Sequence, residues 1–216
     1  MPALQTWWTL DIAELAPRAH HDTVAAIGAD LRRRLEEPHR SYHTAHHLVE
    51  LFWALEDLEN ARELNAREAT VARVAGWFHD AVYDPASSGD NEIRSAELAA
   101  RDLQALGFDT DDAKTVRDLV LATQTHELTT DRLRASFHDA DLWILSAPPE
   151  RYAEYTRQVR EEYAAVPDDA FRSGRAAILG PFLARETIYA TEHAREHWED
   201  AARVNLAAEL KELTRP

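Results

Sequence analysis

The stretch VARVAGWFHDAVYD, residues 71–84, is apolar on most of its circumference when it is placed on a helix, up to the pair His79–Asp80. A helix that is apolar nearly all round lies in the centre of a helical protein, so we expect the other elements to pack around this one. The pair at its end puts two ionisable groups at depth, which is costly unless something compensates. A divalent cation between them would compensate, and a His–Asp hydrogen bond that closes the helix end is the alternative.

Helices are predicted over nearly the whole chain on either side of this segment. Ala, Leu, Glu and Arg dominate, Gly occurs only 6 times, and runs of β-branched residues are missing. Pro, Gly and Ser punctuate the pattern, most clearly in DPASSGDN at 84–91. The fold class predicted is therefore all-α, with a single domain over residues 1–216. The expected helices span about residues 20–36, 44–64, 67–83, 91–106, 110–126, 131–145, 149–164, 168–186 and 193–213.

Composition limits the classes of function. The 216 residues carry 39 acidic against 24 basic side chains, a formal net charge of −15. We expect no binding of extended nucleic acid, because neutralising a phosphate backbone requires basic surface. Since the chain has no cysteine, any metal ion must be held by nitrogen and oxygen ligands.

The sequence also predicts the cellular location of the protein. No apolar run approaches the roughly 20 residues of a membrane span. The N-terminal segment MPALQTWWTLDIAELAP lacks the basic region and the apolar core of a signal peptide. We therefore expect a soluble, cytoplasmic protein with no membrane partner, and a homodimer is one option for its oligomeric state.

Three histidines lie close together in SYHTAHHLVEL, residues 41–51. On a helical wheel His47 falls beside a stripe of leucines, and His43 lies just outside that stripe. His46 falls on the polar side together with Glu50, so we expect it to be solvated. His47 thus points toward the core, where it is either a metal ligand or a hydrogen-bonded core histidine.

A third polar cluster lies in FHDADLWIL, residues 137–145. Its carboxylates, Asp139 and Asp141, immediately precede an apolar run, so we expect them at the edge of the core. An N-cap or a solvated first turn accounts well for Asp139. It accounts less well for Asp141, which four apolar residues follow directly.

In this order on an all-α chain, His47, His79–Asp80 and Asp141 resemble the H…HD…D signature of the HD superfamily of metal-dependent phosphohydrolases. Most of the chain, about residues 40–210, is further similar to one bacterial family of predicted HD phosphohydrolases. Thr44 stands where that family commonly has Asn. The matching segments are YHTAHHL, WFHDAVYDP, DNEIRSAEL, ATQTH, FHDADLWIL, YAEYTRQVREEY and FRSGRAAIL.

The resemblance implies a single-domain HD-type helical bundle, with the core motif region at about 40–145 and C-terminal helices at 149–213 packed on it. It implies one divalent metal ion bound by His47, His79, Asp80 and Asp141. Two imidazoles and two carboxylates suit Mn²⁺, Fe²⁺, Co²⁺, Ni²⁺ or Zn²⁺, and Mg²⁺ is a further candidate.

Such an ion would polarise a phosphoryl group and lower the pKa of a bound water to give the nucleophile. The resemblance suggests that Asp80 also orients that water. Glu92 is a candidate general base or acid, and the alternative is an ordinary glutamate in the first turn of a helix. His126 is a candidate proton donor or ligand of a second metal, and the alternative is a histidine that complements a helix C-terminus.

Four residues are candidates for binding substrate. His43 would face the substrate or support a ligand, and Asn91 lies in a matching segment. Arg160 and Arg175 also lie in matching segments, and either could grip a phosphate with two hydrogen bonds. The alternative for both arginines is ion pairing at the surface, which is common in so acidic a chain.

These features predict an enzyme that hydrolyses a phosphoester bond in a small phosphorylated metabolite or nucleotide. One alternative is a diiron oxygenase on the same HD scaffold, which requires extra histidines between the HD pair and the final aspartate. This chain offers only His126 and His138 there. The other alternative is a non-catalytic regulatory protein that binds a metal ion or a nucleotide.

Overall fold

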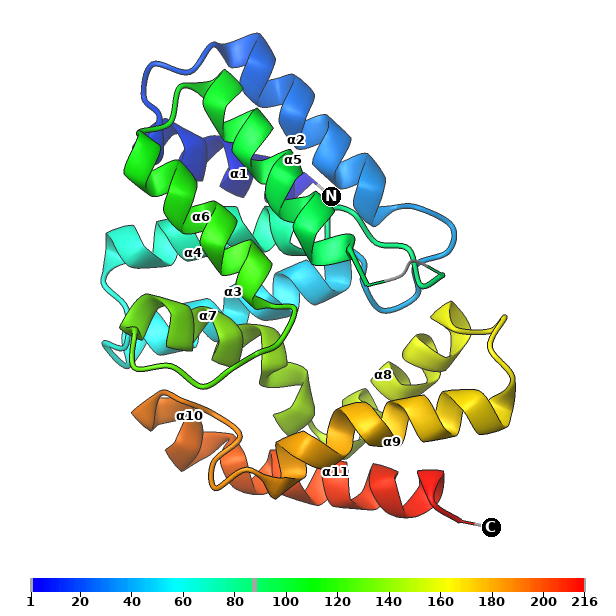
Figure 1. The fold of residues 1–216 in the computed structure, drawn as a ribbon. Coiled ribbons are helices and arrows are strands. Elements are labelled where there is room, and N and C mark those ends of the chain that lie inside the picture. The colour runs from blue at the N-terminus through cyan, green and yellow to red at the C-terminus, as the bar shows by residue number, and fades with distance from the viewer. Residues whose placement is uncertain (1, 87–88, 216) are drawn as a thin grey trace.

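All regular elements in residues 2–86 and 89–215, the part of the chain that the computed structural model describes, are helices, so the predicted all-α fold class is confirmed (Figure 1). They are α1 (Pro2–Leu15), α2 (His21–Leu35), α3 (Ala45–Asn60), α4 (Ala66–His79), α5 (Asn91–Leu106), α6 (Thr110–Ala122), α7 (Arg132–Asp141), the short 3₁₀ helix η1 (Leu142–Ser146), α8 (Pro149–Glu162), α9 (Asp168–Ala184), α10 (Glu192–His197) and α11 (Glu199–Leu213).

The central helix is α4, as the pattern of residues 71–84 predicts. It contacts α1, α3, α5, α6 and α7, and every residue from Ala69 to His79 except Arg73 is buried. Gly76 lets α3 approach closely, because a methyl group at this position would lie 3.0 Å from side-chain atoms of both Leu51 and Phe52. The burial of α4 therefore determines how deep its last residue, His79, lies.

α1 is absent from the helices predicted above. Its side chains Leu4, Trp8, Ile12 and Leu15 recur at helical spacing and are all buried, and the helix contacts α2 and α4. The Trp8 indole N–H donates to the Val24 carbonyl of α2 at 2.8 Å. The spacing of these four apolar residues was the signal available in the sequence.

Five predicted helices end or break at least four residues earlier than expected. The helices predicted over 44–64 and 67–83 end at Asn60 and His79, and the other three lie further along the chain. The helix predicted over 110–126 ends at Ala122, and the one over 131–145 tightens after Asp141 into η1. The helix predicted over 193–213 is interrupted at Trp198, between α10 and α11. The early ends of α6 and α7 matter for the site. They leave His126 outside helix α6 and place Asp141 at the end of α7.

The C-terminal helices α8, α9 and α11 lie beneath the helices around α4 (Figure 1). Arg151 of α8 donates two hydrogen bonds to the carboxylate of Glu50 in α3, at 2.5 and 2.8 Å. Glu50 is 4% exposed, which corrects its expected place on the polar side of α3. The side-chain amide of Asn205 in α11 also donates hydrogen bonds to the backbone carbonyls of Leu145 and Ala147, at the end of η1.

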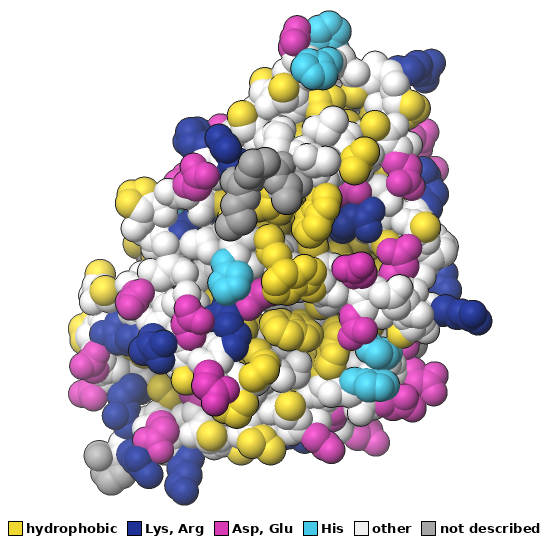
Figure 2. Space-filling view, turned by 180° about the vertical axis from the view of Figure 1, so that it is seen from behind, with side chains coloured by type: hydrophobic (Ala, Val, Ile, Leu, Met, Phe, Trp, Pro, Cys, Tyr) yellow, Lys and Arg dark blue, Asp and Glu magenta, His cyan; other side chains and the backbone are white. Residues whose placement is uncertain are grey.

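The surface is mixed in character. Figure 2 shows a band of hydrophobic side chains down the middle of one face, with side chains of both charge signs around it. Large apolar side chains that are more than half exposed occur on α1, α3, α9 and α11, at Leu10, Trp53, Ile178 and Val204. Across the described residues, none of the helices combines the length and the apolarity that crossing a membrane requires.

We expect Gly28→Ala to destabilise the protein by about 1–3 kcal/mol, because overpacking a full core costs about that much. A methyl group at Gly28 would lie 2.5 Å from the ring of Trp8, which is fully buried and cannot move aside. Urea unfolding measures the change. The matched control is Gly180→Ala in α9, where a methyl group meets nothing within 4 Å. That variant should be as stable as wild type or up to about 1 kcal/mol more stable. An unchanged midpoint for Gly28→Ala would contradict the packing of α1 on α2.

Candidate metal centre

Four side chains from the ends of three helices converge in the interior. His47 lies in the first turn of α3, His79 is the last residue of α4 with Asp80 directly after it, and Asp141 is the last residue of α7. The C-terminal ends of α4 and α7 therefore both meet this point. A helix C-terminus carries partial negative charge, so this arrangement favours a cation between them.

The nitrogen and oxygen atoms of these side chains lie close to one another. His79 Nε2 lies 2.9 Å from Asp80 Oδ2 and 3.1 Å from His47 Nε2. Asp141 Oδ1 lies 3.1 Å from His47 Nε2 and 3.3 Å from His79 Nε2. The buried cluster of His47, His79 and Asp80, with ligand atoms all within 4.8 Å of one another, can hold a metal ion.

In both imidazoles, the ring nitrogen that faces away from the cluster, Nδ1, has a hydrogen-bond partner, and this arrangement suits metal binding through Nε2. His79 Nδ1 lies 2.8 Å from the carbonyl oxygen of Gly76. A carbonyl only accepts, so Nδ1 carries the proton and Nε2 of the neutral ring keeps its lone pair for a ligand. His47 Nδ1 similarly pairs with the hydroxyl of Tyr42 at 3.0 Å. Both rings thus turn Nε2 toward the carboxylates.

The charges of the cluster favour a bound cation. Burial alone would lower the pKa of His79, but Asp80 and Asp141 outweigh it and raise that pKa well above its ordinary value. Burial alone would raise the carboxyl pKa values, but the nearby imidazoles, His79 foremost, hold the pKa of Asp80 and of Asp141 well below the usual range. The carboxylates stay ionised, and a metal ion can take the place of the protons that the imidazoles attract.

The cluster lies at the inner end of a cavity with two parts. We call the part against the cluster the inner chamber, of about 180 Å³, and the larger part the outer cavity, of about 670 Å³. The outer cavity runs along α9 and is large enough for a ligand the size of a nucleotide. Residues that line both parts are His43, Asp80, Glu92, Thr123, His126 and Tyr155.

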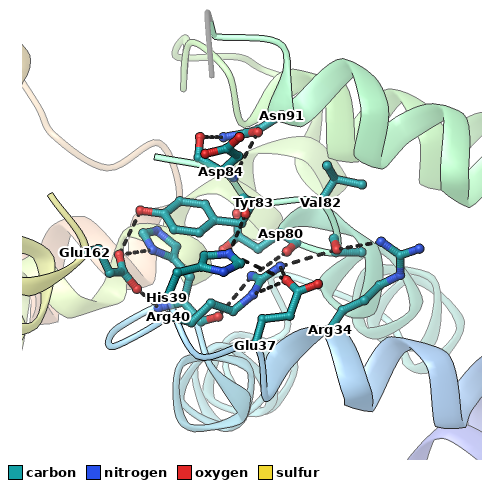
Figure 3. Close-up of polar contacts among 12 residues, drawn as sticks. Arg34, Glu37, His39, Arg40, Asp80, Val82, Tyr83, Asp84, Asn91 and Glu162 are labelled. Atoms are coloured by element: carbon teal, nitrogen blue, oxygen red, sulfur yellow. Dashed lines mark hydrogen bonds and ion pairs between the residues drawn. The ribbon is translucent and has the colours of Figure 1, made fainter. Parts of the chain in front are cut away.

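A buried glutamate of α8 holds the segment before α3 in place. The carboxylate of Glu162 accepts hydrogen bonds from the backbone N–H groups of Ser41, Tyr42 and His43 at 2.8, 2.7 and 2.9 Å. It also accepts from His43 Nδ1 at 2.7 Å. A further bond comes from the hydroxyl of Tyr83 at 2.8 Å (Figure 3). This leaves Nε2 as the free ring nitrogen of His43, which lines both parts of the cavity.

The same contacts set the charge of the His43–Glu162 pair. Burial alone would lower the pKa of His43, but Asp80 and Glu162 raise it above its ordinary value. Burial alone would raise the pKa of Glu162, but its hydrogen bond and charge interaction with His43 bring it down to about 2. The contact therefore favours the protonated form of the imidazole and the ionised form of the carboxylate.

Arg40 holds the backbone that follows α4. Its guanidinium donates to the carbonyls of His43 at 3.1 Å and of Asp80 at 2.8 Å, and pairs with Glu37 at 3.0 Å (Figure 3). His39 reaches the Tyr83 carbonyl at 2.8 Å beside it. These bonds bring the segment before α3 and the segment after α4 together, so His43 and Asp80 face one cavity.

The predicted catalytic residues lie in the cavity wall. Glu92, in the first turn of α5, makes no ion pair with another described residue and faces both parts of the cavity. His126 Nε2 lies 3.4 Å from Asp141 Oδ2. The backbone of His126 has φ +44°, a left-handed conformation that is uncommon outside glycine and costs energy. Burial lowers the pKa of His126, so its ring is neutral.

Two of the predicted substrate-binding residues line the outer cavity but have their polar groups engaged. Both ends of the Asn91 amide bond the backbone of Asp84, at 3.2 and 3.1 Å (Figure 3). Arg175 pairs with Glu209 at 2.9 Å and donates to the hydroxyl of Tyr155 at 2.8 Å. Their side chains therefore shape the cavity wall.

The prediction that Arg160 contacts substrate is corrected by its position. Arg160 does not line the cavity. Its guanidinium donates to the carbonyls of Tyr163 and Val166, at 2.7 and 3.1 Å, and to the carboxylate of Asp168 at 2.5 Å. These bonds connect the end of α8 to the start of α9.

The remaining histidine and aspartate of the third cluster do not join the metal centre. Asp139 accepts hydrogen bonds from the backbone N–H groups of Ala190 and Thr191 before α10, so it does not cap its own helix. His138 is buried beside His126, and burial lowers its pKa to about 4. Among the described residues, the group whose ligand atoms all lie within 4.8 Å of one another is His47, His79 and Asp80.

Comparison of the chain with protein-family models, with curated proteins and with solved structures found no match. The residues of the site are therefore the basis for any functional conclusion. Three features of the site matter most: the convergent imidazoles and carboxylates, the His43–Glu162 pair, and the large outer cavity.

Loss of one imidazole should abolish tight metal binding. We expect the wild-type protein to bind about one Mn²⁺ per chain and His79→Ala to bind it about 100-fold more weakly or worse, since even supporting residues of metal sites are worth 10- to 100-fold. Isothermal titration calorimetry measures both. The control is His46→Ala, because His46 is exposed and turned away from the cluster. Equal binding by wild type and His79→Ala would contradict the proposed ligand set.

Proposed function

We propose that the protein is a metal-dependent phosphohydrolase of the HD type, which cleaves a phosphoester bond in a small phosphorylated metabolite or nucleotide. His47, His79, Asp80 and Asp141 would hold one divalent ion. The observation that carries the proposal is the convergence of two imidazole nitrogens and two carboxylates at the inner end of a cavity of nucleotide size. The ordered H…HD…D resemblance of the sequence supports the same reaction class.

A divalent ion bound there supplies a Lewis acid for the phosphoryl oxygen and lowers the pKa of the attacking water. Asp80 would orient that water, because its carboxylate lies in the wall of both parts of the cavity. Glu92 would accept the proton of the water as general base. Its carboxylate faces the inner chamber and makes no ion pair with another described residue, so it is available for this role.

His43 would donate a proton to the leaving oxygen of the ester. Glu162 holds Nδ1 of the ring at 2.7 Å and favours the protonated form, so a second proton is available on Nε2. A histidine oriented by a buried carboxylate is a common arrangement for proton transfer. In this proposal Glu162 is a positioning residue, and His43 replaces His126 as the proton donor.

His126 would act in its neutral form. Burial lowers its pKa, so at neutral pH the ring has no second proton to donate to a leaving group. A proton on Nε2 points at Asp141 Oδ2, 3.4 Å away, and keeps the other carboxylate oxygen directed at the two imidazoles. The energy stored in its left-handed backbone is consistent with a residue held in place for function.

Replacing Asp80, a proposed metal ligand that would also orient the attacking water, should abolish hydrolysis without unfolding the protein. We expect Asp80→Ala to lower kcat for a generic phosphoester in the presence of Mn²⁺ by about 1,000-fold or more, because a metal-ion mechanism contributes several kcal/mol. Asp80 follows the last turn of α4, so the helical circular dichroism should not change. Unchanged turnover by a folded Asp80→Ala variant would overturn the proposed function.

Substrates with different leaving groups can test whether His43 donates the proton to the leaving oxygen. We expect His43→Gln to lower kcat about 100-fold or more on an alkyl phosphate, the usual contribution of general acid catalysis. On p-nitrophenyl phosphate the loss should be much smaller, because p-nitrophenolate leaves without a proton. Steady-state kinetics on both substrates measures the difference, with His46→Gln as the control. An equal loss on both substrates would show that His43 is not the proton donor.

A further inference from the structure

Arg185 is a cationic side chain of the outer cavity whose guanidinium has no ion-pair partner among the described residues. Its Nη1 atom is buried without a hydrogen bond, and its guanidinium makes no ion pair with any residue in the described ranges. The other arginine of the cavity, Arg175, is saturated by Glu209 and Tyr155. A buried donor without a hydrogen bond costs free energy, and a cation without a counter-ion in the wall of a cavity favours an anionic ligand there.

The surroundings of Arg185 keep it charged and in place. It is the residue that ends α9, where the partial negative charge of the helix terminus favours a cation. Its guanidinium carbon lies 4.4 Å from the ring centre of Phe182, a cation–π contact. The carboxylate of Glu127 interacts with it only from beyond ion-pair distance, and burial lowers its pKa. None of these contacts uses its hydrogen-bond donors.

Arg185 belongs to a different part of the cavity from the metal cluster. It lines the outer cavity and is not among the residues that line the inner chamber. Between it and the cluster lie the ring of Phe182, 6.4 Å from the ring of His126, and His126 itself, which contacts Asp141. A ligand group that Arg185 holds in the outer cavity is therefore distinct from a phosphoryl group held in the inner chamber.

Much of the wall of the outer cavity along α9 is apolar. Helix α9 presents Phe171, Ile178 and Phe182 to the outer cavity, and Tyr163 from the end of α8 adds a further ring. Ile178 is 59% exposed although it lies on the cavity side of its helix. A ligand whose carbon frame lies along this wall would cover apolar surface that is otherwise hydrated.

We propose that the substrate carries a second anionic group, a phosphate or a carboxylate, which Arg185 binds in the outer cavity. The scissile phosphate, whose identity rests on the proposed function, lies at the metal cluster, and an apolar or aromatic spacer joins the two along α9. This narrows the substrate class to bis-anionic organic phosphates. Arg185 is then the residue that selects them over simple phosphate monoesters.

Phosphonates test this without turnover, because their carbon–phosphorus bond is not hydrolysed. The probes are linear alkane bisphosphonates of increasing spacer length, the ω-phosphonoalkanoates and the alkyl phosphonates of the same lengths, titrated calorimetrically into the Mn²⁺-loaded protein. At the best length we expect the bis-anionic probe to bind about 10-fold or more tighter than the alkyl phosphonate, the effect of one bidentate charged contact. The preference between phosphonate and carboxylate tells which group Arg185 recognises.

Arg185→Gln should remove this preference and leave the affinity for the alkyl phosphonate unchanged. Arg185→Lys should retain part of it, because a lysine keeps the charge but not the paired donors. The matched control is Arg157→Gln, an exposed arginine of α8 that does not line the cavity, and it should bind every probe as wild type does. Melting curves of all variants check that each is folded.

Equal affinity of the wild type for bis-anionic and mono-anionic probes at every length would overturn the proposal, and so would a preference that survives in Arg185→Gln. Failure here is distinguishable from failure of the proposed function. Binding of the probes needs no catalysis, whereas the hydrolysis lost in Asp80→Ala does not depend on Arg185. Hydrolysis with no bis-anionic preference would therefore leave the reaction standing and remove only the role of Arg185.

Discussion

The burial of α4 on all sides is the constraint on which the rest of the structure depends. Because its neighbours α1, α3, α5, α6 and α7 cover it, its last residue, His79, and the following Asp80 are delivered into the interior. Two ionisable groups at that depth require compensation. The start of α3 and the end of α7 bring His47 and Asp141 to the same point. The packing of one apolar helix therefore forms the core and also positions a cluster of side chains that favours a cation.

The parts of this arrangement that follow from local periodicity could be predicted. The all-α fold class, the central position of α4 and the inward turn of His47 with His46 exposed all come from residues spaced by turns of one helix. The resemblance to HD proteins then brought the distant Asp141 into the set. The missed helix α1 is an exception, since Leu4, Trp8 and Ile12 carried a readable spacing.

The parts that depend on partners far along the chain could not be predicted. Glu50 looks solvated on a helical wheel and is buried because Arg151, about 100 residues later, neutralises it. Glu162 resembles any surface glutamate of a charged helix, yet it holds His43 from another part of the fold. Arg160 and Arg185 are alike in the sequence, and only tertiary packing saturates the first and leaves the second without an ion-pair partner among the described residues.

Helix α9 has a consequence for how molecules enter the site. Of its described side chains only Leu179 is fully buried, so little apolar burial holds this wall against the rest of the protein. Segments with so few buried contacts open locally far more often than the whole chain unfolds. We therefore expect the amides of α9 to exchange with solvent ahead of those in α4, which would make the α9 side of the outer cavity the more mobile one. Entry of a ligand into that cavity would then depend on the local stability of a single helix.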